Sequence, residues 1–491
     1  MNAFLVAAGI LLSRVAGLIR QRIFFRYFGV SDAADAFTQA FRIPNILQNL
    51  FGEGVLSASF IPVYSKLLAE HDEQEAGRVA GAVAAILSLI TLLLVLVGVA
   101  ATPLLIDLIA PGFTGAKRDL TIRLVRILFP GMGLLVLSAW CLGILNSHRR
   151  FFLSYAAPVL SSAAMIATMI LFRRQDQWAL ASTLAWGSVA GSALQLGVQL
   201  PMVMRLVRKF GMRYSEHVAT VLRNFTPVFF SRGVVQISGY IDGMFATLLG
   251  SGAVAALAAS QTVSMLPVSL FGMAISASEL PEMAASRESD LLARLNSGLR
   301  RIAFFVVPSV VAFLALGDVV IAVLFQNGEF TRQNARYVWG ILAGSGVGLL
   351  ATTMGRLYSS AWYALRDTRT PLRFAIIRVA LGTTMGYAAA FPLGFGVPGL
   401  TAASGLAGWV EFTLLRRSLN QRLGRTGVPA ILLAKLWGAA AIAAIAAWAL
   451  RGTWDLLVLA VYGAVYLGAA SALQVTEGVF DFLLRLGRRR R

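Results

Sequence analysis

Charged side chains interrupt the apolar stretch 13–62, where a simple membrane-spanning sequence would carry none. They are Arg14, Arg20, Arg22, Arg26, Asp35, Arg42 and Glu53. An arginine at the centre of a bilayer costs roughly 2.5–3.5 kcal/mol on insertion scales, so such a side chain is expected to face a protein interior or a watery cavity. Guanidinium groups are suited to bidentate contact with phosphate. The stretch therefore predicts a cationic chamber for an anionic substrate.

Arg14 and Arg20 lie about 120° apart around the first expected helix, at 100° per residue. From these positions two long side chains can converge on one cavity. We expect both to bind the substrate, with Ser13 as a secondary contact. Snorkelling toward the membrane interface is the alternative for Arg20, Arg22 and Arg26, but it is harder to apply to Arg14.

A polar stripe is expected along the second hydrophobic segment, 33–66. Its members fall within about 120° of arc and extend over about 27 Å, nearly the depth of the hydrocarbon. They are Asp35, Gln39, Arg42, Asn45, Asn49 and Glu53, and apart from Gln39 we expect each to contact the substrate. Pro44 is expected to kink this helix and free backbone carbonyls. Hydrogen bonds between helices, without a substrate, are the alternative explanation.

Further charged residues lie in or near later apolar segments. They are Arg232, Asp242, Glu279, Asp318, Arg356 and Glu411. Arg232 and Asp242 share one segment and are placed to pair. We expect Arg232 and Arg356 as secondary contacts for the substrate, since an intramembrane charge is costly without a function. Buried ion pairs without a transport role are the alternative.

The elements that position these side chains are membrane-spanning helices. The chain has 491 residues, of which 57% are hydrophobic and 13% charged, against about 25% charged in soluble proteins. Hydrophobic runs of about 20 residues recur to its end, which predicts an all-α, polytopic membrane protein. The first run lacks the basic n-region of a cleaved signal peptide.

The sequence lacks the motifs that are typical of several other classes of protein. Cys141 is the only cysteine, and the histidines His71, His148 and His217 are scattered, so neither a disulfide framework nor a metal site built on these residues is expected. No phosphate-binding glycine loop or soluble domain occurs, and we expect neither an enzyme nor a bound cofactor. The net charge of +20 raises nucleic acid as a partner, but the basic residues follow the topology instead.

Fourteen hydrophobic segments are expected, and Gly or Pro punctuates most of the breaks between them. Their ranges are 3–28, 33–66, 76–110, 119–146, 154–172, 177–206, 218–250, 253–285, 298–326, 334–365, 371–392, 396–420, 429–450 and 455–484.

Alternate loops between these segments differ in basic content. One set holds roughly 25 Lys and Arg residues and the other roughly 8, a strong positive-inside bias. This predicts an even number of spans with both termini in the cytoplasm. The basic tail 485–491 is expected to set orientation and contact anionic membrane lipids.

A faint internal repeat has an offset of 219 residues. Residues 57–62 (SASFIP) resemble 276–281 (SASELP), and the same offset relates Arg150 to Arg369. Parallel repeats of six spans are typical of transporters with a substrate site between the halves. We therefore expect an N-terminal lobe over 1–210, a C-terminal lobe over 211–425, and two additional helices with a basic tail over 426–491.

Several motifs together resemble the MurJ (MviN) family, lipid II flippases of the multidrug/oligosaccharidyl-lipid/polysaccharide exporter superfamily. The resemblance covers nearly the whole chain and is densest in the first 63 residues. The motifs are SRVAGLIR (13–20), AADAF (33–37), FRIPNIL (41–47), FGEGVLSASFIPV (51–63), APGF (110–113), LFQNGEFT (324–331) and DTRTP (367–371).

The resemblance implies a fold, an activity and roles for particular residues. It implies fourteen helices, two six-helix lobes around a cationic cavity, and a groove for a polyprenyl tail formed by the last two helices. Arg14 and Arg20 match first-helix arginines that would hold pyrophosphate, and Asp35 matches an acidic residue that begins the second helix. Some members are thought to bind sodium, for which Asp242 is the candidate here, although 371–392 offers no acidic partner.

The sequence departs from the family pattern at three places. Gln48 and Asn49 stand where an arginine usually follows the second-helix motif, and Thr262 replaces the arginine of the eighth-helix pattern. Gln21 stands where an acidic residue often follows the second arginine of the first helix. The cavity is therefore expected to be cationic mainly on the side of the first helix.

We expect a flippase that carries undecaprenyl-pyrophosphate-linked peptidoglycan precursor across the inner membrane by alternating access, in cell wall synthesis. Sodium, protons or the membrane potential are candidate energy sources, and proteins of cell-wall synthesis are candidate partners. The alternatives are a flippase for another polyprenyl-linked glycan such as an exopolysaccharide unit, a cation-coupled drug exporter, and a non-transporting envelope scaffold.

Overall fold

The computed structural model describes residues 2–51, 53–207, 210–211, 215–285 and 288–475. Within these ranges the chain is helical and has no strand, apart from an isolated bridge between Asn327 and Phe330. The all-α prediction is confirmed. Among the described residues, eight helical stretches are long and apolar enough to cross a membrane, and the count of fourteen spans stays a prediction.

Each predicted hydrophobic segment coincides with one helix or with successive helices. The first seven correspond to α1 (Asn2–Phe28), α2 (Asp32–Phe51) with α3 (Glu53–Ala69), α4 (Glu73–Ala100) with α5 (Thr102–Ile109), α6 (Gly115–Ser147), α7 (Phe151–Ala156) with α8 (Pro158–Leu171), α9 (Gln177–Leu206) and α10 (Glu216–Thr247). The other seven correspond to α11 (Ala253–Pro267) with η1 (Val268–Met273) and α12 (Ala274–Ala285), α13 (Glu288–Phe325), α14 (Arg332–Ala364), α15 (Arg369–Ala390), α16 (Gly396–Leu423), α17 (Ala430–Ala449) and α18 (Asp455–Ala472).

The chain folds into two compact units. Unit 1 contains Met1–Ala255 and Asn327–Phe330, and unit 2 contains Ala256–Gln326 and Thr331–Arg491. The units divide near residue 255, because α10 packs against α3, α2 and α4 of unit 1. The lobe boundary expected at 210 stays a prediction. The helices α17 and α18 pack against α13 and belong to unit 2.

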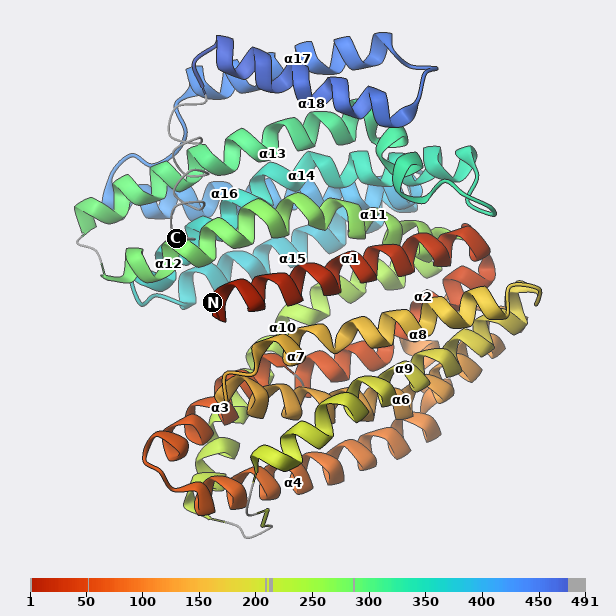
Figure 1. Ribbon diagram of the computed structural model, residues 1–491. Coiled ribbons are helices and arrows are strands. Elements are labelled where there is room, and N and C mark those ends of the chain that lie inside the picture. Colours follow the sequence, from red (N-terminus) through yellow and green to blue (C-terminus); the bar gives the residue numbers. More distant parts are fainter. Residues whose placement is uncertain (1, 52, 208–209, 212–214, 286–287, 476–491) are drawn as a thin grey trace. The chain divides into compact units, whose positions relative to one another are not determined.

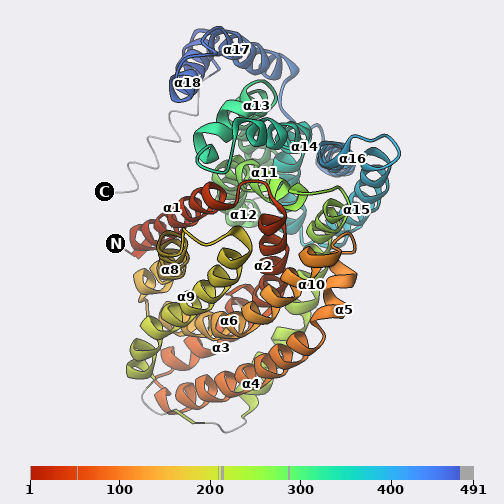
Figure 2. The same cartoon turned by 90° about the vertical axis from the view of Figure 1, so that its right-hand side faces the viewer.

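In unit 1, α6 is the central helix and packs against α9, α2, α4 and α3 (Figure 2). Small residues allow this close packing, since a Cβ added to Gly143 would lie 3.2 Å from the ring of Phe60. The few polar groups in this core bond to each other: Ser138 donates to Gln199 at 2.6 Å and Gln195 donates to Ser138 at 2.9 Å.

The two sets of loops lie at opposite ends of unit 1, as alternate membrane crossings require. At the end with few basic loop residues, the Glu329 amide donates to the Arg26 carbonyl at 2.9 Å and Gln177 donates to the Tyr27 carbonyl at 3.2 Å. At the other end, Ser65 donates to Ser147 at 3.0 Å. We call the first of these the outer end.

In unit 2, α16 packs against both α14 and α15. The backbones of α14 and α16 meet at two glycines, because a Cβ on Gly348 would lie only 2.3 Å from the Cα of Gly405. Small residues at facing positions are the usual way for membrane helices to approach this closely.

The helix α13 is irregular, and its neighbours complete its hydrogen bonds. Pro308 has no N–H to bond the Phe304 carbonyl, which instead accepts from the Tyr466 hydroxyl at 2.6 Å. Leu316 has non-helical torsion angles, and near this kink Trp339 donates to the Phe313 carbonyl at 3.0 Å. The α17–α18 hairpin beside α13 (Figure 1) is thus bound through backbone carbonyls as well as apolar contact.

Candidate functional site

The two arginines of α1 differ in their surroundings. The Arg14 side chain is exposed, whereas Arg20 is partly buried. The Arg20 Nη1 lies 3.7 Å from the Met165 sulfur of α8, and its guanidinium carbon lies 5.9 Å from the centre of the Phe41 ring of α2. No carboxylate of the described residues pairs with either arginine, so both positive charges remain uncompensated by the protein.

Asp35 holds unit 1 together at its outer end. Its side chain is fully buried, and its carboxylate accepts hydrogen bonds from the amides of Gly252 at 2.7 Å and Ala255 at 2.8 Å. The amino group of Lys117 completes the set at 2.6 Å. All of these partners belong to the protein, so Asp35 anchors the described structure, and its contact with the substrate stays a prediction.

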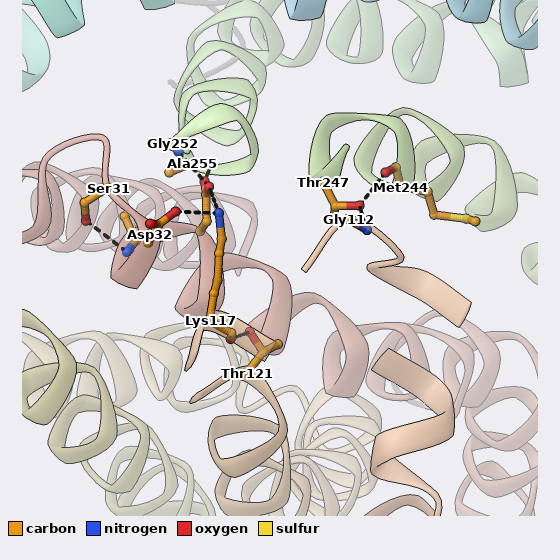
Figure 3. Close-up of polar contacts among 11 residues, drawn as sticks. Ser31, Asp32, Gly112, Lys117, Thr121, Met244, Thr247, Gly252 and Ala255 are labelled. Atoms are coloured by element: carbon orange, nitrogen blue, oxygen red, sulfur yellow. Dashed lines mark hydrogen bonds and ion pairs between the residues drawn. The ribbon is translucent and has the colours of Figure 1, made fainter. Parts of the chain in front are cut away.

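Lys117 joins three segments that are distant in the sequence. It lies in the first turn of α6, and its amino group also reaches Asp32 at 2.8 Å, at the start of α2 (Figure 3). The Asp35 carboxylate in turn caps the first turn of α11, an arrangement that favours a negative charge. Sequence reasoning overlooked Lys117 as a partner of Asp35 because it precedes the expected segment 119–146 and belongs to no motif.

The stripe on α2 is buried in part. The Gln39 amide is buried and donates to the Ile109 carbonyl at 3.0 Å, so it is a helix–helix contact. The Arg42 guanidinium lies against α10, where a Cβ on Gly243 would approach its Nη1 to 2.3 Å. Asp242 is close enough to attract Arg42 electrostatically. The structure therefore brings Arg42 and Asp242 together, a pair that the sequence did not predict.

The remaining candidates are placed as follows. Ser13 and Asn45 are half-buried. The side chains of Asn49, Glu53 and Arg232 lie outside the described part of the chain, as does residue 52. The part of the stripe from Asn49 to Glu53 therefore stays a prediction. Arg356 is exposed on α14 of unit 2.

Unit 2 has a charge cluster of its own. Arg378 of α15 lies 3.0 Å from the Glu411 carboxylate of α16, and Arg356 of α14 is close enough to interact with both. The three residues carry one net positive charge. Sequence reasoning singled out Arg356 and Glu411 but overlooked Arg378, whose signal was an arginine in the middle of an apolar segment.

Thr262, which replaces an arginine of the family pattern, forms a hydrogen bond within its own helix. Its hydroxyl donates to the Ala258 carbonyl one turn earlier, at 2.9 Å. A threonine bonded in this way carries no charge, so α11 adds no cation at this position.

The sodium site that the resemblance suggests at Asp242 stays a prediction. The Arg42 guanidinium, itself a cation, is close enough to attract this carboxylate electrostatically. Among the described residues, no group of three or more acidic, histidine or cysteine side chains could hold a metal ion.

Comparison with solved structures defines the class of protein. The fold is similar to an inward-facing multidrug resistance MATE family transporter of the MOP superfamily, with a TM-score of 0.68 and 17% identity over 86% of this chain and 99% of that one. It is more similar to an inward closed lipid II flippase MurJ, with a TM-score of 0.82 and 25% identity over 96% of this chain and 98% of that one. The chain is thus a multi-pass bacterial membrane protein with a transporter fold.

Sequence comparison identifies the family. The family model described as lipid II flippase MurJ matches residues 24–467, and the chain belongs to this family. A probable lipid II flippase MurJ of Rhizobium tropici is 31% identical over 86% of this chain and 81% of its own length. The lipid II flippase MurJ of Burkholderia cenocepacia is 30% identical over 86% and 84%. The family expected from the motifs is confirmed.

Proposed function

We propose that this protein translocates lipid II across the bacterial inner membrane, with both termini in the cytoplasm, and so supplies peptidoglycan synthesis. Membership of the MurJ family over 24–467 supports this substrate. Enzymes that polymerise the precursor on the far side of the membrane are then the expected protein partners.

The observation that carries the proposal is the state of the two α1 arginines. Arg14 and Arg20 have no carboxylate partner among the described residues. A guanidinium at membrane depth needs a counter-charge, and a pyrophosphate supplies one in the geometry that arginine binds best. Arg20 is oriented by Met165 and Phe41, while Arg14 is exposed and able to meet the ligand.

We assign the driving force to the membrane potential or to protons. We favour them over sodium because the Arg42 guanidinium attracts the Asp242 carboxylate electrostatically. In an alternating-access cycle the empty cationic site would be reset by the potential, which is worth about 2.3 kcal/mol per charge per 100 mV. The anionic head group would neutralise the site on the outward step.

A second candidate is a flippase for another polyprenyl-linked glycan. Thr262, Gln48 and Asn49 favour it, because they remove cations that the family pattern provides. The pyrophosphate chemistry is shared, and only the sugar and peptide would differ.

Complementation of a flippase-depleted bacterium tests the proposal. We expect the wild type to restore growth and the Arg14→Ala and Arg20→Ala variants to fail while reaching the membrane in normal amounts. Arg173→Ala, an exposed arginine of the α8–α9 loop, is the matched control and should rescue. Failure of the wild type, with export of another labelled polyprenyl glycan in vesicles, would favour the second candidate.

A further inference from the structure

A recess of about 450 Å³ lies on unit 1 between α6 and α9. Its lining residues are Asp119, Ile122, Arg123, Arg126, Ile127, Pro130 and Trp186. All of them except Trp186 belong to α6. The charged ones lie on one exposed stripe of this helix, whereas Leu120 and Leu124 on other faces are buried. The recess therefore faces away from the core of unit 1.

The two arginines of the recess make no bond that stabilises the described part of the fold. Arg123 and Arg126 are exposed, and neither makes a hydrogen bond or ion pair within the described part of the chain. They lie one helical turn apart and line the same recess. Asp119 in the same recess balances one of these two charges, and an anion between the guanidinium groups would balance the other.

The depth of the recess matches that of lipid head groups. The 33 residues of α6 extend over about 50 Å, some 20 Å more than the hydrocarbon of a bilayer. Arg123 and Arg126 lie about 12 Å and 16 Å from the outer end of α6, close to the boundary between head groups and hydrocarbon. Trp186 is about 14 Å from the start of α9, at the level where tryptophan belts occur.

The recess is also graded in polarity along the membrane normal. Asp119 lies nearest the outer end, Ile122 and the two arginines follow, and Ile127 and Pro130 lie deepest. Below Pro130 the neighbouring helices close in, since Gly131 packs on Val189 of α9. A ligand that fits has its charge in the middle and its apolar part at the bottom, which is the order of groups in a phospholipid.

We propose that this recess binds the phosphate of an anionic phospholipid in the leaflet at the outer end. Arg123 and Arg126 hold the phosphate, while Ile127, Pro130 and Trp186 contact the upper acyl chain. The arginines exceed Asp119 by one charge, so a singly negative head group leaves the site neutral. The site requires only that α6 spans the membrane and is independent of lipid II transport.

Native mass spectrometry of the full chain in detergent, titrated with phosphatidylglycerol or phosphatidylcholine, tests this site. We expect phosphatidylglycerol to bind at least about tenfold more tightly than phosphatidylcholine, because charge-assisted bonds to phosphate are strong. The Arg123→Gln/Arg126→Gln variant should lose this preference, and Arg123→Lys/Arg126→Lys should keep part of it. The matched control is Arg173→Gln/Arg174→Gln, which removes two exposed arginines at the same end.

Three results would overturn the proposal. One is equal binding of the two phospholipids, and another is an unchanged preference in the Gln double variant. The third is displacement of phosphatidylglycerol by lipid II in the wild type but not in the Gln double variant, which would assign the recess to the transport substrate. Lipid-free melting temperatures within a few degrees of each other establish that all the variants are folded.

Discussion

The Lys117 amino group lies 2.6 Å from the carboxylate of Asp35, whose side chain is fully buried. Asp35→Ala leaves two backbone amides and a lysine without this acceptor, and should cost about 3–5 kcal/mol of stability, as expected when a buried pair is broken. Thermal unfolding of the purified protein measures the loss.

Asp32→Ala is the matched control for Asp35, since Asp32 pairs with the same lysine but is 45% exposed in its side chain. Its loss should cost about 1 kcal/mol or less. If the two variants melted at the same temperature, the anchoring role of Asp35 would be wrong.

Tyr466 should matter to stability only while Pro308 is present. Tyr466→Phe leaves the Phe304 carbonyl unsatisfied in an apolar setting and should cost about 1–3 kcal/mol. In the Pro308→Ala background, the new backbone N–H can bond this carbonyl, so the same substitution should cost much less. Additive losses in the double variant, measured by thermal unfolding, would contradict this account of α13.

Glu411 balances the positive charges of Arg378 and Arg356 in unit 2. Replacing Glu411 alone should therefore destabilise the protein more than replacing Glu411 and Arg378 together. Glu411→Gln leaves Arg378 and Arg356 facing each other without their carboxylate. We expect the Glu411→Gln/Arg378→Gln variant to be more stable than the sum of the two single losses predicts, by about 1–3 kcal/mol. A double-mutant cycle on melting temperatures provides the measurement, and a coupling of zero would show that the pair is incidental.

His148 should make stability depend on pH. Burial is the main cause that lowers the pKa of His148 below the ordinary value. The negative charge of Glu73 opposes this shift, and the positive charge of Arg150 adds a smaller lowering. The Tyr64 hydroxyl lies 3.1 Å from its Nε2.

Because the folded state favours neutral His148, the unfolded state binds more protons near the ordinary pKa of about 6.5. The contribution of this residue is therefore complete above that pH and is lost as the pH falls toward the lowered pKa. His148→Gln should flatten the fall in melting temperature between neutral and mildly acidic pH. His71→Gln, in an exposed loop, is the control and should leave the curve unchanged.

Apolar run length predicted the elements of the fold well, because a membrane helix must satisfy all of its own backbone. Breaks within runs were missed although signals existed. The division between α4 and α5 at Ala101, and between α7 and α8 at Ala157, each lies just before a proline, Pro103 and Pro158. The kink at Leu316 has no such signal and depends on donors, such as the Trp339 indole N–H, for its freed carbonyls.

Charge alone did not distinguish anchoring residues from binding residues. Asp35 looks like a cavity residue on a helical wheel, but Lys117 is 82 positions away and the amides that bind it belong to α11 and the turn before it. Such partners are set by tertiary contact, which helical periodicity does not encode. Substrate binding by Arg14 and Arg20 stays a prediction, and among the described residues neither arginine pairs with a carboxylate.

The hydrogen bond from Tyr466 to the Phe304 carbonyl has a consequence for biosynthesis. The two residues are 162 positions apart, which corresponds to about 10–30 s of bacterial translation. During that interval α13 is in the membrane with a carbonyl that only a later helix can satisfy. This hydrogen bond of unit 2 therefore forms only after α18 has been made, so packing of the C-terminal hairpin against α13 is a late step in the assembly of the unit.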